Sequence, residues 1–114
     1  MKYDLEERTY KFAKGCRDFV SILPRTVSNI EYGKQLIRSS GSQAANYIEA
    51  GEKLSKKDFI FRMKITRKET KESALWLRLC DTNGDYKLEE ESKKLSKEST
   101  ELRNIFSAII KKSE

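Results

Sequence analysis

The 114-residue chain contains no histidine. Histidine is the commonest general base and metal ligand, so its absence excludes His-dependent triads and the di-iron bundles built on Glu-x-x-His pairs. The sequence also has no glycine-rich phosphate loop, and its two cysteines, Cys16 and Cys80, are too widely separated for a zinc site. We therefore predict a protein that is not an enzyme and has no cofactor or metal. A Ser-Lys or paired-carboxylate enzyme is the remaining catalytic alternative.

Helix-breaking residues and long apolar runs are equally scarce. One proline and five glycines are too few for a sandwich of many short strands. No segment approaches the run of about 18 apolar residues that a membrane span needs, and the opening MKYDLEERTYKF lacks the apolar core of a signal peptide. We expect a soluble, cytoplasmic protein with no membrane partner, whose cysteines are buried free thiols rather than a disulfide.

The chain does contain segments with apolar residues at helical spacing. Three capping patterns, at Asp4, Ser28 and Ser55, each place an acidic residue three positions after the cap. Pro24 ends the first segment, and Asn83-Gly84 is a turn signal after the third. The predicted helices span residues 5–23, 28–53, 55–83 and 89–112. Joined by short links, they predict an all-α fold, an antiparallel up-down-up-down four-helix bundle, with one domain over residues 1–114.

The core side of each helix follows from the same spacing. The predicted core stripes are Phe12, Cys16, Phe19, Val20 and Leu23 in the first helix, Phe59, Met63, Thr66, Thr70, Ala74, Leu77 and Cys80 in the third, and Leu88, Ser92, Leu95, Ser99, Leu102, Phe106 and Ile109 in the fourth. In the second predicted helix, the apolar and small residues on one side are Tyr32, Leu36, Ser40, Ala44, Tyr47 and Gly51. The opposite side carries Arg38, Ser42 and Glu49, and the small residues around them would let another helix approach closely. This helix is therefore expected to pack on two sides.

Positive charge gathers on one side of the third predicted helix. The chain has a net charge of +6 and an isoelectric point near 9.3. At about 100° per residue, six of its cations fall within roughly a quadrant, next to the core stripe. We call them the basic ridge: Lys57, Lys64, Arg67, Lys68, Lys71 and Arg78. The ridge predicts contacts to the phosphate backbone of RNA or DNA, with a solvated lysine-rich face as the alternative. Nothing resembles a base-reading motif, so binding would be governed by charge and shape.

The third predicted helix also carries apolar residues on a flank that is separate from both its core stripe and the basic ridge. A helix that is apolar on two sides is either central in a bundle or part of a subunit interface. Together with the close-approach side of the second helix, these residues make up a predicted interface between subunits: Arg38, Ser42, Glu49, Phe61, Ile65, Trp76 and Leu79. The alternative is a well-covered core.

The segment from Asp81 to Ser92 imitates a calcium-binding loop. Asp81, Asn83 and Asp85 occupy the first, third and fifth ligand positions of such a loop. However, Tyr86 replaces the glycine of the sharp turn, and Ser92 replaces the bidentate glutamate at the last position. We interpret the segment as a polar turn that caps two helices, at best with weak affinity for calcium.

Several stretches together resemble a known bacterial family. They are RSS at 38–40, ANYIEAG at 45–51, SKKDF at 55–59 and KETKESALWLRL at 68–79, with a further likeness at 105–111. The sequence resembles the four-helix-bundle family that includes proteins encoded in intervening sequences of large-subunit ribosomal RNA genes and the accessory proteins of diversity-generating retroelements. The resemblance implies an up-down-up-down bundle, a barrel-like homopentamer and no known enzymatic activity. For the retroelement proteins it also implies binding of nucleic acid and of a reverse transcriptase through a basic exterior.

These observations support one leading hypothesis and two rivals. The leading hypothesis is a non-enzymatic, oligomeric RNA- or DNA-binding accessory protein that acts through the basic ridge and aids a reverse transcriptase or ribosomal RNA. One rival is a protein-interaction scaffold whose basic face docks an acidic protein partner without nucleic acid. The other is a bundle that binds calcium or a small molecule.

Overall fold

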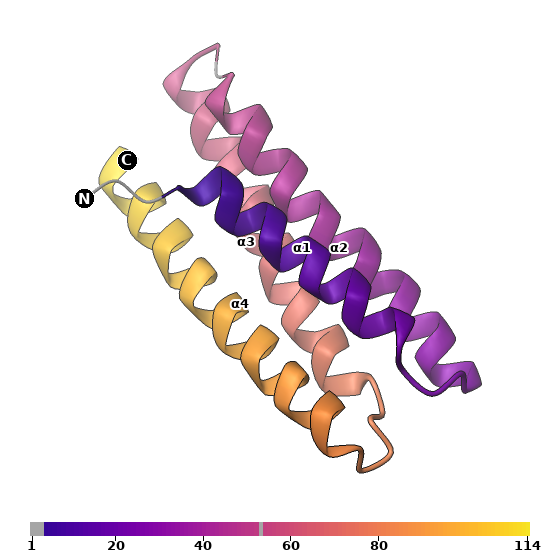
Figure 1. Cartoon of the computed structure of the whole chain (residues 1–114). Coiled ribbons are helices and arrows are strands. Elements are labelled where there is room, and N and C mark those ends of the chain that lie inside the picture. Colours follow the sequence, from indigo (N-terminus) through magenta and orange to yellow (C-terminus); the bar gives the residue numbers. More distant parts are fainter. Residues whose placement is uncertain (1–3, 53) are drawn as a thin grey trace.

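Four α-helices make up almost all of the fold. The computed structural model describes residues 4–52 and 54–114. The helices are α1 (Leu5–Ser21), α2 (Val27–Gly51), α3 (Lys56–Leu79) and α4 (Tyr86–Ser113). Each packs antiparallel against the next, and α4 returns beside α1, so the start of α1 and the end of α4 lie at one end of the bundle (Figure 1). The predicted up-down-up-down bundle is confirmed. Within the described ranges, no helix is both long and apolar enough to cross a membrane.

The helix starts show which capping predictions were right. The Asp4 side chain accepts a hydrogen bond from the Glu7 amide at 3.0 Å, and Ser55 accepts one from Asp58 at 3.0 Å, as predicted. The cap of α2 was wrong by two residues, because Thr26 rather than Ser28 accepts the Asn29 amide, at 3.1 Å. A cap needs extended backbone, which Thr26 has, whereas residue 28 is already helical.

The helix ends also differ from the predicted ones. Helix α3 stops at Leu79, four residues before Asn83, because the backbone of Cys80 is already extended (φ −64°, ψ 132°). The chain then turns through positive φ angles of 54° at Asn83 and 74° at Gly84. Helix α4 starts at Tyr86 rather than at residue 89, because the Asp85 side chain caps it by accepting the Leu88 amide at 2.9 Å. The predicted end of the second helix, Lys53, lies outside the described residues.

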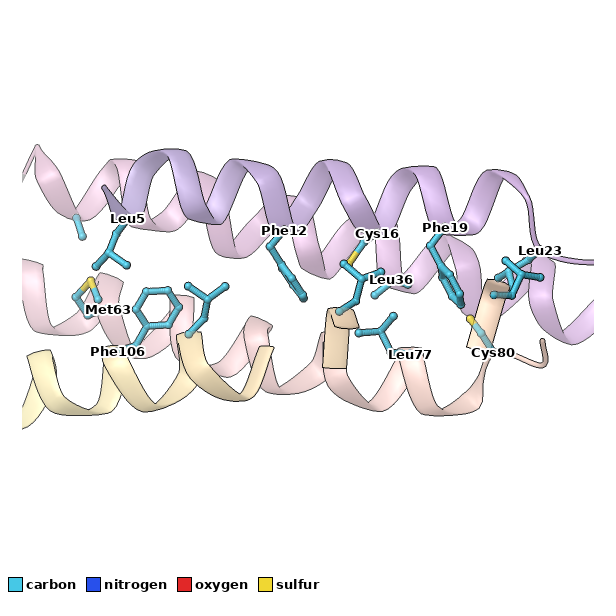
Figure 2. Packing of buried hydrophobic residues seen from close by; sticks show 14 of the residues in the cluster. Leu5, Phe12, Cys16, Phe19, Leu23, Leu36, Met63, Leu77, Cys80 and Phe106 are labelled. Carbon is cyan, nitrogen blue, oxygen red and sulfur yellow. The ribbon is translucent and has the colours of Figure 1, made fainter. Parts of the chain in front are cut away.

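The core is a column of large side chains along the bundle axis. Helix α1 contributes Leu5, Phe12, Cys16 and Phe19, and these side chains meet residues from the other three helices (Figure 2). The side chains that meet them include Leu36, Met63, Leu77, Leu102 and Phe106, all fully buried. The apolar spacing read from the sequence therefore identifies most of the core correctly.

Helix α2 departs from its predicted core stripe. Tyr32, Ala44 and Tyr47 are only partly buried and Gly51 is exposed. The buried stripe of α2 is turned toward α1 and α3 and consists of Asn29, Gly33, Leu36, Ser39, Ser40, Gln43 and Ala50. A Cβ atom on Gly33 would lie 2.8 Å from Val20 Cγ1, so the glycine lets α1 approach closely. Close approach of a neighbouring helix, rather than side-chain hydrophobicity, sets the orientation of α2.

Asn29 joins the two connections at one end of the bundle. Its side-chain Nδ2 donates to the carbonyl oxygens of Pro24 and Asp81, both at 2.9 Å. The Asp81 amide in turn donates to Asn29 Oδ1 at 2.8 Å. Since Asn29 is only 3% exposed, these bonds replace the water that its amide group would otherwise bind. The α1–α2 connection and the α3–α4 connection are thereby tied together.

Both cysteines are buried free thiols, as predicted. Burial raises the pKa of the Cys16 thiol to about 12 and that of the Cys80 thiol to about 11. Both thiols are therefore protonated and unreactive near neutral pH.

Candidate nucleic-acid interface

Helix α3 positions the basic ridge on the side that faces away from the bundle. The opposite side of α3 carries its buried residues, including Met63, Thr66, Thr70 and Leu77. Five of the six ridge residues are exposed: Lys57, Lys64, Lys68, Lys71 and Arg78. The sixth, Arg67, is partly buried and its Nη1 donates to Ser107 Oγ on α4 at 3.4 Å. The structure therefore brings together five of the six predicted cations, with Arg67 at their α4 edge.

The prediction that the ridge lies next to the core stripe needs a correction. The buried side of α3 extends further toward α2 than its apolar residues indicate, because Glu69 and Ser73 are also buried. Ser73 Oγ and Ser39 Oγ of α2 share a hydrogen bond of 2.8 Å. With the core side displaced toward α2, the ridge lies nearly opposite it, near the centre of the solvent-facing side.

Two acidic residues of α3, Glu69 and Glu72, are paired with Arg38 on the flank of the helix that faces α2. Arg38 of α2 bridges Glu72 at 2.9 Å and Glu69 at 3.4 Å, and Ser42 Oγ donates to Glu69 Oε2 at 3.2 Å. The hydrogen bonds and charge of Glu69, followed by Glu72, raise the pKa of the Arg38 guanidinium. Across residues 4–52 and 54–114, no carboxylate forms an ion pair with a ridge cation. The positive charge of the ridge is therefore left uncompensated by direct ion pairs.

The ridge cations border an open depression in the surface. It has a volume of about 380 Å³ and is lined by Lys64, Arg67, Lys68, Lys71, Glu72 and Leu75. Four positively charged side chains around one hollow provide the donors that phosphate oxygens require.

A second depression, between α1 and α4, has a different charge balance. Its volume is about 480 Å³, and three lysines, Lys11, Lys94 and Lys97, share its lining with three glutamates. One of those glutamates, Glu98, pairs with Arg8 at 2.7 Å. Balanced charge disfavours a polyanion there, so the α3 depression is the better candidate for binding phosphate.

Exposed apolar side chains lie within the basic face rather than beside it. Phe61 is 59% exposed, Leu75 46% and Leu79 40%. Phe61 and Leu79 belong to the predicted subunit interface, which the sequence placed on a separate flank of the helix. In the structure they share the solvent-facing side of α3 with the lysines, so the two predicted surfaces overlap.

The other predicted interface residues lie mostly between α2 and α3. Ile65 and Trp76 are partly buried, and the Trp76 ring stacks on Tyr32 of α2 with centroids 5.9 Å apart. Arg38 and Ser42 bind Glu69 within the same chain, whereas Glu49 is exposed. Their part in a contact between subunits stays a prediction.

An exposed apolar stripe on α2 was not predicted from the sequence. Ile30, Ile37 and Ile48 are all exposed along one side of this helix. Between them lies Gly41, where an added Cβ would meet no atom within 4 Å. The seven-residue spacing of Ile30 and Ile37 was a usable signal for this stripe.

The segment that imitates a calcium loop forms a turn. Asp81 Oδ1 accepts the Asn83 amide at 2.8 Å, and the Asp85 carboxylate caps α4. Ser92 lies inside α4, on the helix rather than in the turn. Among the residues that the structure describes, no group of three or more acidic, cysteine or histidine side chains is placed to hold a metal ion. These bonds agree with the polar-turn interpretation.

Comparisons with known proteins add family information. Residues 1–108 match the profile of the family described as 23S rRNA-intervening sequence protein. A crystal structure of a protein of unknown function from the S23 ribosomal protein family, from Bacteroides thetaiotaomicron VPI-5482, superposes with a TM-score of 0.77 at 30% sequence identity. The match covers 93% of this chain and 97% of that one. No curated protein matches the sequence.

Proposed function

The chain belongs to the 23S rRNA-intervening sequence protein family, and from this premise we propose that it is a non-enzymatic, oligomeric accessory protein that binds RNA through the basic ridge. The single observation that carries the proposal is the uncompensated charge on the solvent-facing side of α3. The family name makes RNA the first nucleic acid to test, with DNA as the second. The absence of histidine supports a role without catalysis.

The dimensions of the ridge suit a nucleic-acid backbone. From Lys57 to Arg78 the helix rises about 32 Å at roughly 1.5 Å per residue, which is long enough to follow several phosphates. Binding of this kind releases counterions and weakens steeply with salt. Since the contacts are to phosphates, the protein would show little sequence preference.

Self-association is part of the proposal, and a pentamer is expected from the family resemblance. An interface over Phe61 and Leu79 would also cover the lysines beside them and remove those charges from water at a large cost. The exposed isoleucines of α2 would not cover the ridge, which lies on α3, although Arg25 and Lys34 border the hollow beside Ile30 and Ile37. We therefore propose that α2 supplies the subunit contact through Ile30, Ile37 and Ile48. A monomer by light scattering at micromolar concentration would reject the oligomer.

The nucleic-acid proposal is tested by fluorescence anisotropy with a structured RNA between about 50 and 200 mM salt. Reversing Lys64, Lys68 and Lys71 to glutamate is expected to weaken binding by at least about a hundredfold at low salt, and to lower the salt slope by roughly two to three. A matched control reverses Lys14, Lys87 and Lys93, which are exposed on α1 and α4. It changes the net charge equally and should weaken binding far less.

Each outcome discriminates between the hypotheses. No binding of the wild-type protein to RNA or duplex DNA at low salt would reject the proposal. An unchanged salt slope in the ridge variant would move the site elsewhere. If a specific acidic protein still binds to the ridge in a pull-down after nuclease treatment, the scaffold function is favoured instead. A gene position beside a reverse transcriptase, rather than inside a ribosomal RNA gene, would support a polymerase partner.

A further inference from the structure

Phe61 is an unusual phenylalanine in this protein. Phe12, Phe19 and Phe106 are at most 2% exposed and fill the core, whereas Phe61 is 59% exposed at the centre of the solvent-facing side of α3. Exposure of a large aromatic ring to water contributes nothing to folding, since the hydrophobic gain comes from removing such area from water. The position of this ring therefore suggests a partner outside the bundle.

Cations lie along one flank of Phe61, whereas Asp58 and Ile65 lie along the other at the same helical spacing. Lys57 lies one turn before it and Lys64 one turn after it on the same side of the helix, because residues three and four positions apart are neighbours on a helix surface. The Arg62 guanidinium carbon lies over the ring, 6.0 Å from its centroid. Arg62 is held there by Asn46 Oδ1 of α2, which accepts from its Nη1 at 3.3 Å. An aromatic ring among lysines, with a planar guanidinium beside it, offers stacking and phosphate contacts at one place.

We infer that the basic ridge takes unpaired nucleotides, with one base stacked on the ring of Phe61 and the flanking phosphates bound by Lys57 and Lys64. The inference rests on the proposed function and specifies the kind of nucleic acid. Every base has an apolar π face, so stacking adds affinity without reading sequence. An unpaired strand exposes those faces, as loops and bulges of RNA do.

Paired nucleic acid fits the same surface less well. Helix α3 is packed between α2 and α4, so it presents only its outer side and cannot enter a groove to any depth. The major groove of an RNA duplex is in any case too narrow for side chains to read. A duplex would touch the lysines through its phosphates and would place polar backbone against Phe61. Only a strand with free bases uses both the charge and the ring.

The test compares two RNA ligands with equal numbers of nucleotides, a single-stranded oligouridylate of about twenty nucleotides and a blunt-ended duplex of two strands of about ten nucleotides each. Phe61→Leu keeps an apolar side chain but removes the ring. We expect roughly a tenfold loss of affinity for the single strand and less than about a twofold loss for the duplex. Tyr10→Leu is the matched control, because Tyr10 is an exposed aromatic on α1, a helix that does not pack directly beside α3 in the described parts of the chain.

A second variant checks the stacking itself. Phe61→Trp should keep the affinity for the single strand, and its fluorescence should be quenched when the oligonucleotide binds. The contribution of the native Trp76 is subtracted with the wild-type protein. Circular dichroism of each variant confirms that the bundle is folded.

The outcomes separate this inference from the proposed function. If the wild-type protein binds neither RNA, both fail. If it binds both and Phe61→Leu changes neither affinity, or lowers both equally, stacking on Phe61 is wrong while RNA binding by the ridge stands. An unquenched tryptophan at position 61 in a complex of full affinity would also overturn the stacking.

Discussion

On the side of α3 that faces α2, Glu69 and Ser73 are buried and each has a hydrogen-bonding partner on the neighbouring helix. On the side that faces solvent, Lys64 and Lys68 stand one turn apart, with no carboxylate in an ion pair with either in the described parts of the chain. The buried, hydrogen-bonded residues stabilise the bundle. The exposed lysines contribute nothing to its stability, and their like charges repel each other. One helix therefore separates the residues needed for folding from those available for binding.

The largest effect is expected from enlarging a residue between α2 and α3. Ser39 is fully buried and bonded to Ser73, so Ser39→Leu would force the two helices apart and lower the free energy of unfolding by about 3 kcal/mol. The matched change on the outer side, Lys68→Leu, should alter it by less than about 0.5 kcal/mol. Urea denaturation measures both. Equal losses would show that the two sides of α3 do not differ in this way.

A smaller effect concerns the Cys80 thiol at the end of α3. Its pKa is raised from 9.0 to about 11 by burial. The contribution of the protonated thiol to the free energy of unfolding is therefore complete below pH 9.0. It is lost as the pH rises toward 11, because the unfolded chain releases the proton at a lower pH than the folded chain.

Between about pH 8 and pH 10.5, the wild-type protein should lose up to about 2 kcal/mol more stability than Cys80→Ala. Thermal denaturation at the two pH values measures the difference. Parallel losses in the two proteins would mean that the thiol titrates alike in the folded and unfolded states.

Removal of a paired acid should have a more modest effect. Glu69→Ala leaves the Ser42 hydroxyl without its acceptor and is expected to cost about 1 kcal/mol. Glu72→Ala removes a more exposed partner of Arg38 and should cost less than about 0.5 kcal/mol. Chemical denaturation of the two variants ranks them, and the reverse order would contradict the burial of Glu69 as the decisive factor.

The smallest predicted effect has the opposite sign. Replacing Lys64 and Lys68 by glutamine removes a like-charge pair four residues apart, and should stabilise the protein by about 0.3 kcal/mol at low salt. The gain should vanish at about 1 M salt because the charges are then screened. A loss of stability in this variant would show that the ridge supports the fold.

The sequence predicted the bundle because its large apolar residues follow helical spacing in every helix. It also predicted the caps at Asp4 and Ser55 and the exposed lysines of α3. It was only partly right for α2, where Leu36 and Ser40 are buried as predicted but the burial of Gly33, Ser39 and Gln43 was missed. Their burial depends on close helix contacts and on hydrogen bonds to a neighbouring helix, which hydrophobicity along one helix does not report.

The same limit applies to the candidate site. Nothing in the sequence marks Glu69 as buried, yet its partners Arg38 and Ser42 come from another helix and keep it so. The place of Phe61 beside Lys57 and Lys64 follows from helical spacing alone. Its exposure to solvent depends on how α3 packs between α2 and α4, and this required the structure.

The bond network of Asn29 has a consequence for the time course of folding. It joins residues 52 positions apart in the chain, at the open end of the α2–α3 hairpin, so it closes only once these two helices are aligned along their whole length. An interaction made after the transition state slows unfolding and leaves the folding rate almost unchanged. We therefore expect Asn29 to lengthen the lifetime of the native state more than it speeds folding.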